Sequence, residues 1–428
     1  MVLMVLDHAL FYFMDPSVTP VNLSPNSRTT PGIFLAEWMT HFCAPVFFLL
    51  AGVGTYLQVA RGATKEEVAK YLLIRGVLLV LLDMTAVQWA LYYRFDFSSF
   101  VMSSDGEIER MFLFTPLVLW GLGLSMIVMA GLIWLPTVAV SLLGGAMILL
   151  HNLLDKADVN HGLWQWLWLA RHPQANWALS KHITIAVDFS LIPWVGVMAA
   201  GYGLGALFLL PRPRRRAMLL CLGGTCCVAF LVLRTFHLYG DPHPRSGRNV
   251  EPPAAYKTSP VQQEAEPEDL FAGPAGWGPE DRDLFSLLSF INCEKYPASL
   301  QFLLMTLGPA LILLAALDRE PRTDGKNHFA DWLLQPFKFF GRVPLFFYLG
   351  QWFVLHFLAL ALAWAEHRPT HWLFRTYNGG FPGWDPNANM GLGGTYFAWL
   401  VCVLILYPAC VWFARLKDRH RDSWLRYF

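Results

Sequence analysis

Charged residues are scarce in this chain of 428 residues. Asp, Glu, Lys and Arg together make up 15% of the sequence, against about 25% in an ordinary soluble domain. Their charges almost cancel, because the formal net charge is +1. Nucleic-acid binding usually requires an excess of basic residues on one surface, so no nucleic-acid partner is expected.

Cysteine patterns and the motifs of soluble enzymes are also missing. The seven cysteines are odd in number and contain no Cys-x-x-Cys spacing, which argues against a disulfide framework and against a zinc site. No GxGxxG, P-loop, HExxH or GxSxG motif stands in the strand and helix context that gives such motifs their meaning. The sequence therefore indicates no metal cofactor and none of the soluble-enzyme activities that these motifs mark.

Apolar residues, in contrast, are abundant and come in long runs. They make up 55% of the chain, and the mean hydropathy is +0.40. Helices of about 20 apolar residues match the thickness of a bilayer. The candidate spans lie at about 1–14, 33–58, 70–93, 114–134, 136–152, 184–209, 217–236, 297–317, 338–364 and 395–414. We therefore predict an all-α fold, a polytopic integral membrane bundle of about ten transmembrane helices.

The first of these runs is unusually short. Residues 1–14 are too few to cross a bilayer as a helix. No basic segment precedes the run and no small-residue cleavage site follows it, so a removable signal peptide is not expected. Either the first helix is short, or the start codon has been placed too late and part of the helix is missing.

The distribution of basic residues predicts how the helices are oriented. If the N-terminus is cytoplasmic, the inner segments are 61–75, 211–216, 318–342 and 415–428, and they hold more than half of the Lys and Arg residues in a small share of the chain. Cytoplasmic loops of membrane proteins carry such an excess. We expect a multi-pass protein of the cell inner membrane with both termini in the cytoplasm.

One long outer segment divides the chain. We expect an N-terminal transmembrane region at 1–236 with helices one to seven, and a C-terminal transmembrane region at 296–428 with helices eight to ten. The outer loop between them, 237–295, contains an acidic, proline-rich stretch at 241–283. Such a composition is typical of disorder.

Several ionisable residues lie within the apolar runs. A charge near the middle of a bilayer costs at least ~2.5–3.5 kcal/mol, so one that persists there usually has a partner or a function. Asp7 and His8 are adjacent in the first helix, and a neutral imidazole held by a neighbouring carboxylate is a ready general base. We therefore predict His8 and Asp7 as catalytic residues.

Other polar residues are candidates for substrate binding. Arg234, Asn292 and Lys295 fall at the predicted outer face, and His41 falls in the outer half of the second helix. We expect these four to converge with His8 on one cavity that opens outward, and Gln351 is a further candidate for its lining. Plainer explanations stay open: Lys295 can anchor the membrane interface, and the lone Asp83 can pair with a basic residue inside the bundle.

The apolar runs also carry a family resemblance. The chain resembles the bacterial membrane proteins of the heparan-alpha-glucosaminide N-acetyltransferase catalytic-domain family over nearly its whole length, apart from 245–283. The resemblance lies in MVLMVLDHALFYF, THFCAPVFFLLAG, LLIRGVLLVLLDMT, IPWVGVMAAGYGLG, LYGDPHP, INCEKYPASLQFLLMTLGPAL and GRVPLFFYLGQ. It implies a place among the transmembrane acyltransferases, which move acyl groups from cytoplasmic acyl-CoA to acceptors on the far side.

Residue by residue, the resemblance is incomplete. His8 matches the first-helix histidine of the related acyltransferase-3 proteins, whose arginine, eleven positions earlier, would fall before Met1. Relatives usually begin with a SxDxxRG-like stretch, so an upstream extension encoding one is expected. Gln351 stands where relatives usually carry histidine.

Two functions from different classes follow. In the first, acyl-CoA is the co-substrate and its phosphates meet Arg75 near the inner face. His8, oriented by Asp7, deprotonates an amine or hydroxyl of a glycan or lipid-linked acceptor, or carries the acyl group. Lys295, Asn292 or Arg234 stabilises the oxyanion or orients the acceptor.

The second function is a transporter for a small polar solute, although no inverted repeat is visible. Arg75 also has a plainer alternative, since it can extend to the cytoplasmic headgroups. The expected partners are the lipid bilayer, the acceptor and, as an open alternative, a second copy of the chain in a homodimer.

Overall fold

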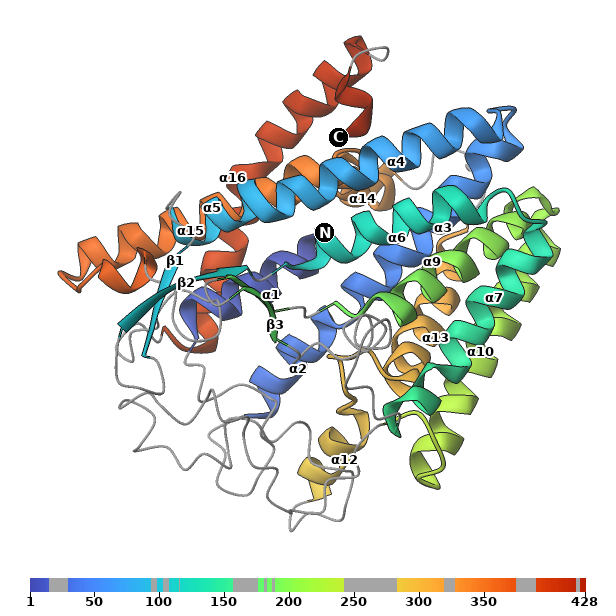
Figure 1. Ribbon diagram of the computed structural model, residues 1–428, viewed down its shortest axis with the longest axis horizontal. Helices are drawn as coiled ribbons and strands as arrows, with labels where there is room; N and C mark the ends of the chain where they lie inside the picture. The colour runs from blue at the N-terminus through green and yellow to red at the C-terminus, as the bar shows by residue number, and fades with distance from the viewer. Residues whose placement is uncertain are drawn as a thin grey trace.

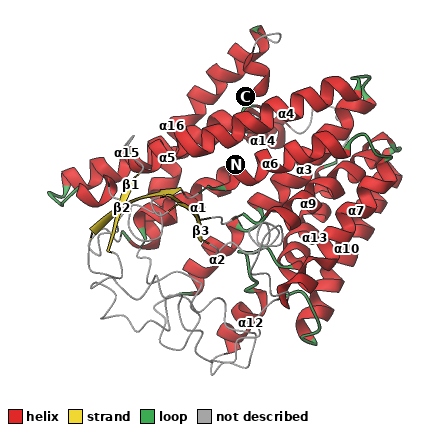
Figure 2. Cartoon of the chain, viewed as in Figure 1, coloured by secondary structure: helices red, strands yellow, loops and turns green. Residues whose placement is uncertain are grey.

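The computed structural model of the chain is dominated by helices (Figure 2). It describes residues 1–14, 30–93, 98–102, 108–114, 116–156, 176–180, 183–186, 189–241, 283–318, 328–374, 390–420 and 424–428. Most of the predicted outer loop, at 242–282, lies outside the described residues. The predicted division into regions 1–236 and 296–428 therefore stays a prediction.

The helices of the first half of the chain are arranged as Figure 1 shows. They are α1 (Val2–Phe13), α2 (Pro31–Thr40), α3 (Cys43–Ala60), α4 (Lys65–Leu82), a π-helical segment (Asp83–Val87), α5 (Gln88–Tyr92), α6 (Val118–Leu132), α7 (Thr137–Leu150) and α9 (Leu191–Gly205). Short 3-10 helices, His151–Lys156 and Ala206–Leu209, extend α7 and α9.

The remaining helices follow in the second half of the chain. They are α10 (Arg212–Thr235), α12 (Asp283–Ile291), α13 (Leu300–Leu317), α14 (His328–Arg342), α15 (Pro344–Ala365) and α16 (Gly391–Arg419). Short 3-10 helices at His371–Phe374 and Trp424–Tyr427 follow α15 and α16.

Eight helical segments among the described residues are long and apolar enough to cross a membrane. Two shorter apolar helices, α1 and α6, complete the set that the hydropathy predicted. Each of the ten predicted spans overlaps one of these segments, so the prediction of a polytopic helical membrane protein is confirmed. The eight segments are Pro31–Ala60, Lys65–Leu91, Thr137–Leu154, Leu191–Leu209, Arg212–Thr235, Leu300–Leu317, Pro344–Ala365 and Gly391–Arg419.

The span predicted at 33–58 is broken into two helices. The chain turns at His41 and Phe42 between α2 and α3. Pro45, the third residue of α3, has no N–H to donate to the carbonyl of His41, and its ring would clash with that carbonyl in a continuous helix. The break exposes the last turn of α2 to the interior of the bundle.

A small sheet, which the sequence did not predict, accompanies the helices. Its strands are β1 (Ser98–Met102), β2 (Ile108–Phe114), β3 (Asn176–Ser180) and β4 (Ile183–Ala186). The strand order is β1-β2-β4-β3, with β2 and β4 parallel and the outer pairs antiparallel. The all-helical prediction therefore holds for the membrane-spanning segments and omits this sheet.

Asp83 joins two of the helices. Its side chain is fully buried, and one carboxylate oxygen accepts the backbone N–H groups of Leu117 and Trp120 at 2.9 Å and 2.6 Å. These groups lie at the N-terminus of α6, where backbone N–H groups lack partners within the helix. Asp83 therefore caps α6, and among the described residues no basic side chain pairs with it.

Ion pairs join helix ends that the predicted topology places on the same side. At the start of α10, Arg215 donates two hydrogen bonds of 2.7 Å to Asp318, which follows α13. The guanidinium group of Arg215 holds the pKa of Asp318 below its ordinary value. Arg342 at the end of α14 pairs with Asp418 at the end of α16. Each pair joins two helix ends that the predicted spans place on the same side of the membrane, so these contacts agree with the predicted spans.

Candidate functional site

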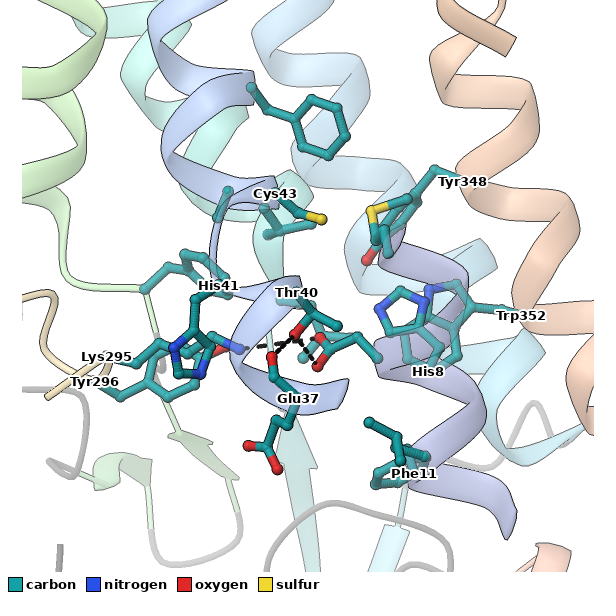
Figure 3. A pocket seen from close by; sticks show the side chains of 18 of the residues that line it. His8, Phe11, Glu37, Thr40, His41, Cys43, Lys295, Tyr296, Tyr348 and Trp352 are labelled. Carbon is teal, nitrogen blue, oxygen red and sulfur yellow. Dashed lines mark hydrogen bonds and ion pairs between the residues drawn. The ribbon is translucent and has the colours of Figure 1, made fainter. Parts of the chain in front are cut away.

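A cavity of about 430 Å³ opens between α1, α2, the start of α3, the start of α6 and α15. Its wall is apolar for the most part, with polar groups gathered at a few positions (Figure 3). The polar and aromatic lining residues include Asp7, His8, Glu37, Thr40, His41, Cys43, Lys295, Tyr296, Tyr348 and Trp352. The cavity thus combines an apolar chamber with several groups that can take part in proton transfer.

Asp7 and His8 face different walls of this cavity. Successive residues of a helix point about 100° apart, and the contacts of the two side chains differ accordingly. The Asp7 carboxylate accepts a hydrogen bond of 2.8 Å from the Thr40 hydroxyl and lies 3.9 Å from the Lys295 ammonium. Among the described residues, no hydrogen bond joins Asp7 to His8. The prediction that Asp7 orients the His8 ring is therefore not supported by the geometry.

His8 is positioned by α15 instead. Its ring stacks on the indole of Trp352 with a centroid distance of 3.7 Å and an interplanar angle of 25°. Gln351, the residue before Trp352, is fully buried and lies beside His8. The Nδ1 atom of His8 is buried without a hydrogen-bond partner among the described residues. Stacking fixes the plane of the ring and leaves a nitrogen for other chemistry.

The break between α2 and α3 supplies the opposite wall. Thr40 ends α2, and its hydroxyl lies between the Asp7 carboxylate and the carbonyl of Glu37. His41 follows at the turn, is 8% exposed and packs its ring 5.5 Å from the ring of Phe302. In Figure 3 His41 lies close to Lys295. The broken helix therefore brings an imidazole, a hydroxyl and a carboxylate into the cavity together.

Lys295 enters from the turn between α12 and α13, and Arg234 holds that turn in place. The Arg234 guanidinium donates to the carbonyls of Ser289, Phe290 and Asn292 at 2.8 to 2.9 Å. It also pairs with Asp241. Carbonyls at the end of a helix lack partners within the helix, so Arg234 caps the C-terminus of α12.

A second support comes from the end of α7. His151 Nε2 lies 2.9 Å from the carbonyl oxygen of Ala298, and Asn152 accepts the backbone N–H of Leu300 at 2.9 Å. Both contacts fall just after Lys295 in the chain. The turn that carries Lys295 is therefore fixed on both sides.

The predicted site residues fall into two groups, those that line the cavity and those that do not. One cavity is lined by His8, Asp7, His41 and Lys295. Arg234 and Asn292 do not line it. Arg234 is 3% exposed and donates its hydrogen bonds to carbonyl oxygens at the end of α12. Gln351 lies behind His8 and does not line the cavity.

Arg75 lies away from the cavity, on α4. It donates to the hydroxyl of Tyr71 and lies over the ring of that residue. Lys417 on α16 interacts electrostatically with Arg75 and with Arg342 of α14. Three helices therefore bring cations together near their predicted inner ends.

Glu37 is the main residue that the sequence analysis missed. It is an acid in an otherwise apolar stretch, PGIFLAEWMT, so the argument that singled out Asp7 applies to it equally. Tyr348 and Trp352 carried no such signal, because aromatic residues are common in membrane helices. Among the described residues, no group of three or more His, Cys, Asp or Glu side chains could hold a metal ion.

Comparison with known families gives one match. Residues 1–231, which hold most of the cavity wall, match the sequence model of the family described as heparan-alpha-glucosaminide N-acetyltransferase, catalytic. Neither a curated protein nor a solved structure matches the chain.

Proposed function

Because the chain belongs to the heparan-alpha-glucosaminide N-acetyltransferase catalytic family, we propose that it is a membrane acetyltransferase. It would move an acetyl group from cytoplasmic acyl-CoA to an amine or hydroxyl of a glycan or lipid-linked acceptor on the outer face. The observation that carries this proposal is the single cavity in which an imidazole, a carboxylate–ammonium pair and a second carboxylate meet.

His8 is the proposed base of the transfer step. A neutral imidazole can take the proton that the acceptor loses as the new bond forms, and can pass it to the leaving thiolate. The stack on Trp352 limits rotation of the ring. Correct orientation of a base is worth a large part of its effect on rate.

Lys295 is the proposed stabiliser of the developing negative charge on the thioester oxygen. Its ammonium group is held by Asp7 at 3.9 Å, inside a largely apolar wall. A fixed positive charge in such a surrounding acts more strongly on a developing oxyanion than it would in water. Asp7 then serves to place Lys295, and not to orient His8.

The donor would reach the cavity from the inner side. Arg75 and Lys417 bring two cations there from α4 and α16, beside Arg342, which pairs with Asp418, and such cations suit the phosphate groups of acyl-CoA. Cys43 and Tyr348 line the part of the cavity away from Glu37. Phe47 also lines the cavity, whose largely apolar wall would provide a passage for the acyl arm.

The test is acetyl-CoA turnover by the purified protein in lipid nanodiscs, with amine and hydroxyl acceptors. His8→Ala should reduce turnover per folded protein by about 10²–10⁴-fold, the usual contribution of a general base. His367→Asn is the matched control, because His367 is exposed after α15 and Asn tolerates its left-handed backbone.

Two results would contradict the proposal at different levels. Undiminished turnover in His8→Ala would remove His8 from the mechanism and leave the activity in place. Absence of acetyl-CoA consumption by the wild type with every acceptor would remove the acetyltransferase function itself. Movement of a polar solute across vesicles in that case would favour a transporter.

A further inference from the structure

Glu37 brings a second carboxylate into the cavity. It lies on α2 about one turn before Thr40, and its carbonyl oxygen is 2.7 Å from the Thr40 hydroxyl. Its carboxylate lines the cavity, and no hydrogen bond or ion pair to that carboxylate is found among the described residues. In Figure 3 the side chain points away from Cys43 and Tyr348, toward the end of the cavity where Phe11 lies.

The charges around Glu37 do not balance. Lys295 is the single ammonium group in the described cavity wall, and it pairs with Asp7. Glu37 interacts electrostatically with both residues, favourably with Lys295 and unfavourably with Asp7. With neutral imidazoles, two ionised carboxylates leave the cavity with one excess negative charge. Such a charge beside an apolar wall is costly unless a cation or a proton accompanies it.

We propose that Glu37 is a catalytic residue that receives the protonated amine of the acceptor and takes its first proton. This inference rests on the proposed acetyltransferase function. An amine in neutral water is mostly an ammonium ion, and its lone pair cannot attack a thioester until one proton has left. An unengaged carboxylate at the far end of the cavity from the acyl passage can bind that ammonium ion and then accept the proton.

Two protons must leave the nitrogen, and the cavity offers two separate acceptors. The first passes from the ammonium group to Glu37, which gives a neutral amine and a carboxylic acid. The nitrogen then attacks the thioester carbon, the C–N bond forms and the C–S bond breaks. The second proton passes through His8 to the thiolate of CoA. The products are an acetamide and the CoA thiol, and Glu37 returns its proton to water.

The other carboxylate is less suited to this step. Asp7 already accepts a hydrogen bond from Thr40 and pairs with Lys295, so binding an ammonium ion there would compete with both contacts. Glu37 has no such competitor among the described residues. Asp7 and Glu37 therefore differ in role although both are acids in the same cavity.

The experiment compares Glu37→Gln with the wild type in nanodiscs, with acetyl-CoA and glucosamine as the probe amine. Near neutral pH, turnover per folded protein should fall at least several-fold, because most of the glucosamine then arrives as an ammonium ion that the variant cannot deprotonate. The loss should shrink as pH rises, because more glucosamine then arrives already deprotonated. Asp7, His8, His41 and Lys295 face the same cavity and are kept in both proteins, so the difference between the two pH profiles reports Glu37.

Two further variants make the result decisive. Glu66→Gln, an exposed acid at the start of α4, is the matched control and should keep the wild-type profile. Glu37→Asp keeps a carboxylate and should keep the shape of the wild-type profile at a lower rate. An equal loss at every pH in Glu37→Gln and Glu37→Asp, with a lowered unfolding temperature, would mark a structural role and overturn the inference.

The two proposals fail in different ways. Turnover of Glu37→Gln equal to that of the wild type at every pH would overturn the role of Glu37 and leave the acetyltransferase function standing. A wild type that consumes no acetyl-CoA with any amine would overturn both.

Discussion

At the scale of single residues, the sequence located ionisable groups better than it located their partners. Asp7 and His8 were found because charged or titratable side chains are rare in apolar helices. Their adjacency suggested a pair, but the turn of the helix directs them to different walls. Asp7 instead meets Thr40 and Lys295. Such long-range partners depend on how the helices pack, and a single sequence has no local pattern that predicts this packing.

The Asp7–Lys295 pair leads to a prediction about stability. Lys295→Met and Asp7→Asn should each lower the stability of the protein, because each leaves the remaining group without its partner. The double variant should regain part of the loss, with an interaction energy of about 0.5–3 kcal/mol. Denaturant unfolding of the four proteins in the same detergent measures it. Additive losses would show that the two groups do not interact.

Measurements of activity distinguish a structural role of the Asp7–Lys295 pair from a role of Lys295 in the reaction. If Lys295 also stabilises the oxyanion, the double variant should remain inactive although its stability recovers, because the ammonium group is still missing. Recovery of turnover together with stability would show that the pair only supports the fold.

At the scale of helices, two close approaches define the packing of α3 against α9. A side chain at Gly52 would collide with the carbonyl oxygen of Met198, and one at Gly201 would collide with the carbonyl oxygen of Leu49. Small residues at helix contacts let backbones approach closely in membranes. Because α3 begins at the cavity with Cys43, this contact also supports the site.

Replacement of one glycine tests that contact. Gly52→Ala should lower stability by about 1–3 kcal/mol, the usual cost of overpacking, although alanine favours a helix more than glycine does. Gly54→Ala is the matched control, since a Cβ there meets nothing within 4 Å, and it should be neutral or slightly stabilising. Thermal unfolding in one detergent compares them. Equal unfolding temperatures for the two variants would contradict the close approach.

Helix boundaries were predictable where a turn residue marked them and unclear elsewhere. Pro136 falls at the boundary between the apolar runs predicted as the spans 114–134 and 136–152, and it is the N-cap residue of α7. Pro45 lies a few residues after the break between α2 and α3, inside a run that reads as one span, so its effect was missed. That break places Glu37, Thr40 and His41 in the cavity, which is why the sequence identified only part of the site.

At the scale of the whole molecule, hydropathy predicted the spans but not the sheet. Apolar runs of bilayer length are a strong local signal, whereas β2 and β4 come from segments far apart in the chain and pair over three residues. No local pattern fixes such a pairing. The predicted cavity is also a property of the whole molecule, since its wall draws on both halves of the chain.

The orientation of the molecule in the membrane is a prediction that the two ends of α10 can test. Arg214 lies in the basic segment before the span, and Leu238, 63% exposed, lies just after it. Basic residues stay on the cytoplasmic side when helices insert, so the start of α10 should face inward and its end outward.

An impermeant maleimide should therefore label Leu238→Cys in intact cells, and Arg214→Cys only after the membrane is permeabilised. The wild type, whose seven cysteines are all free thiols, is the control for background labelling. Labelling of Arg214→Cys but not Leu238→Cys in intact cells would reverse the topology. The cations of Arg75, Arg342 and Lys417 would then face away from the cytoplasm and could not receive cytoplasmic acyl-CoA. Glu37, at the end of the cavity away from the proposed acyl passage, would face the acyl-CoA pool in place of the acceptor.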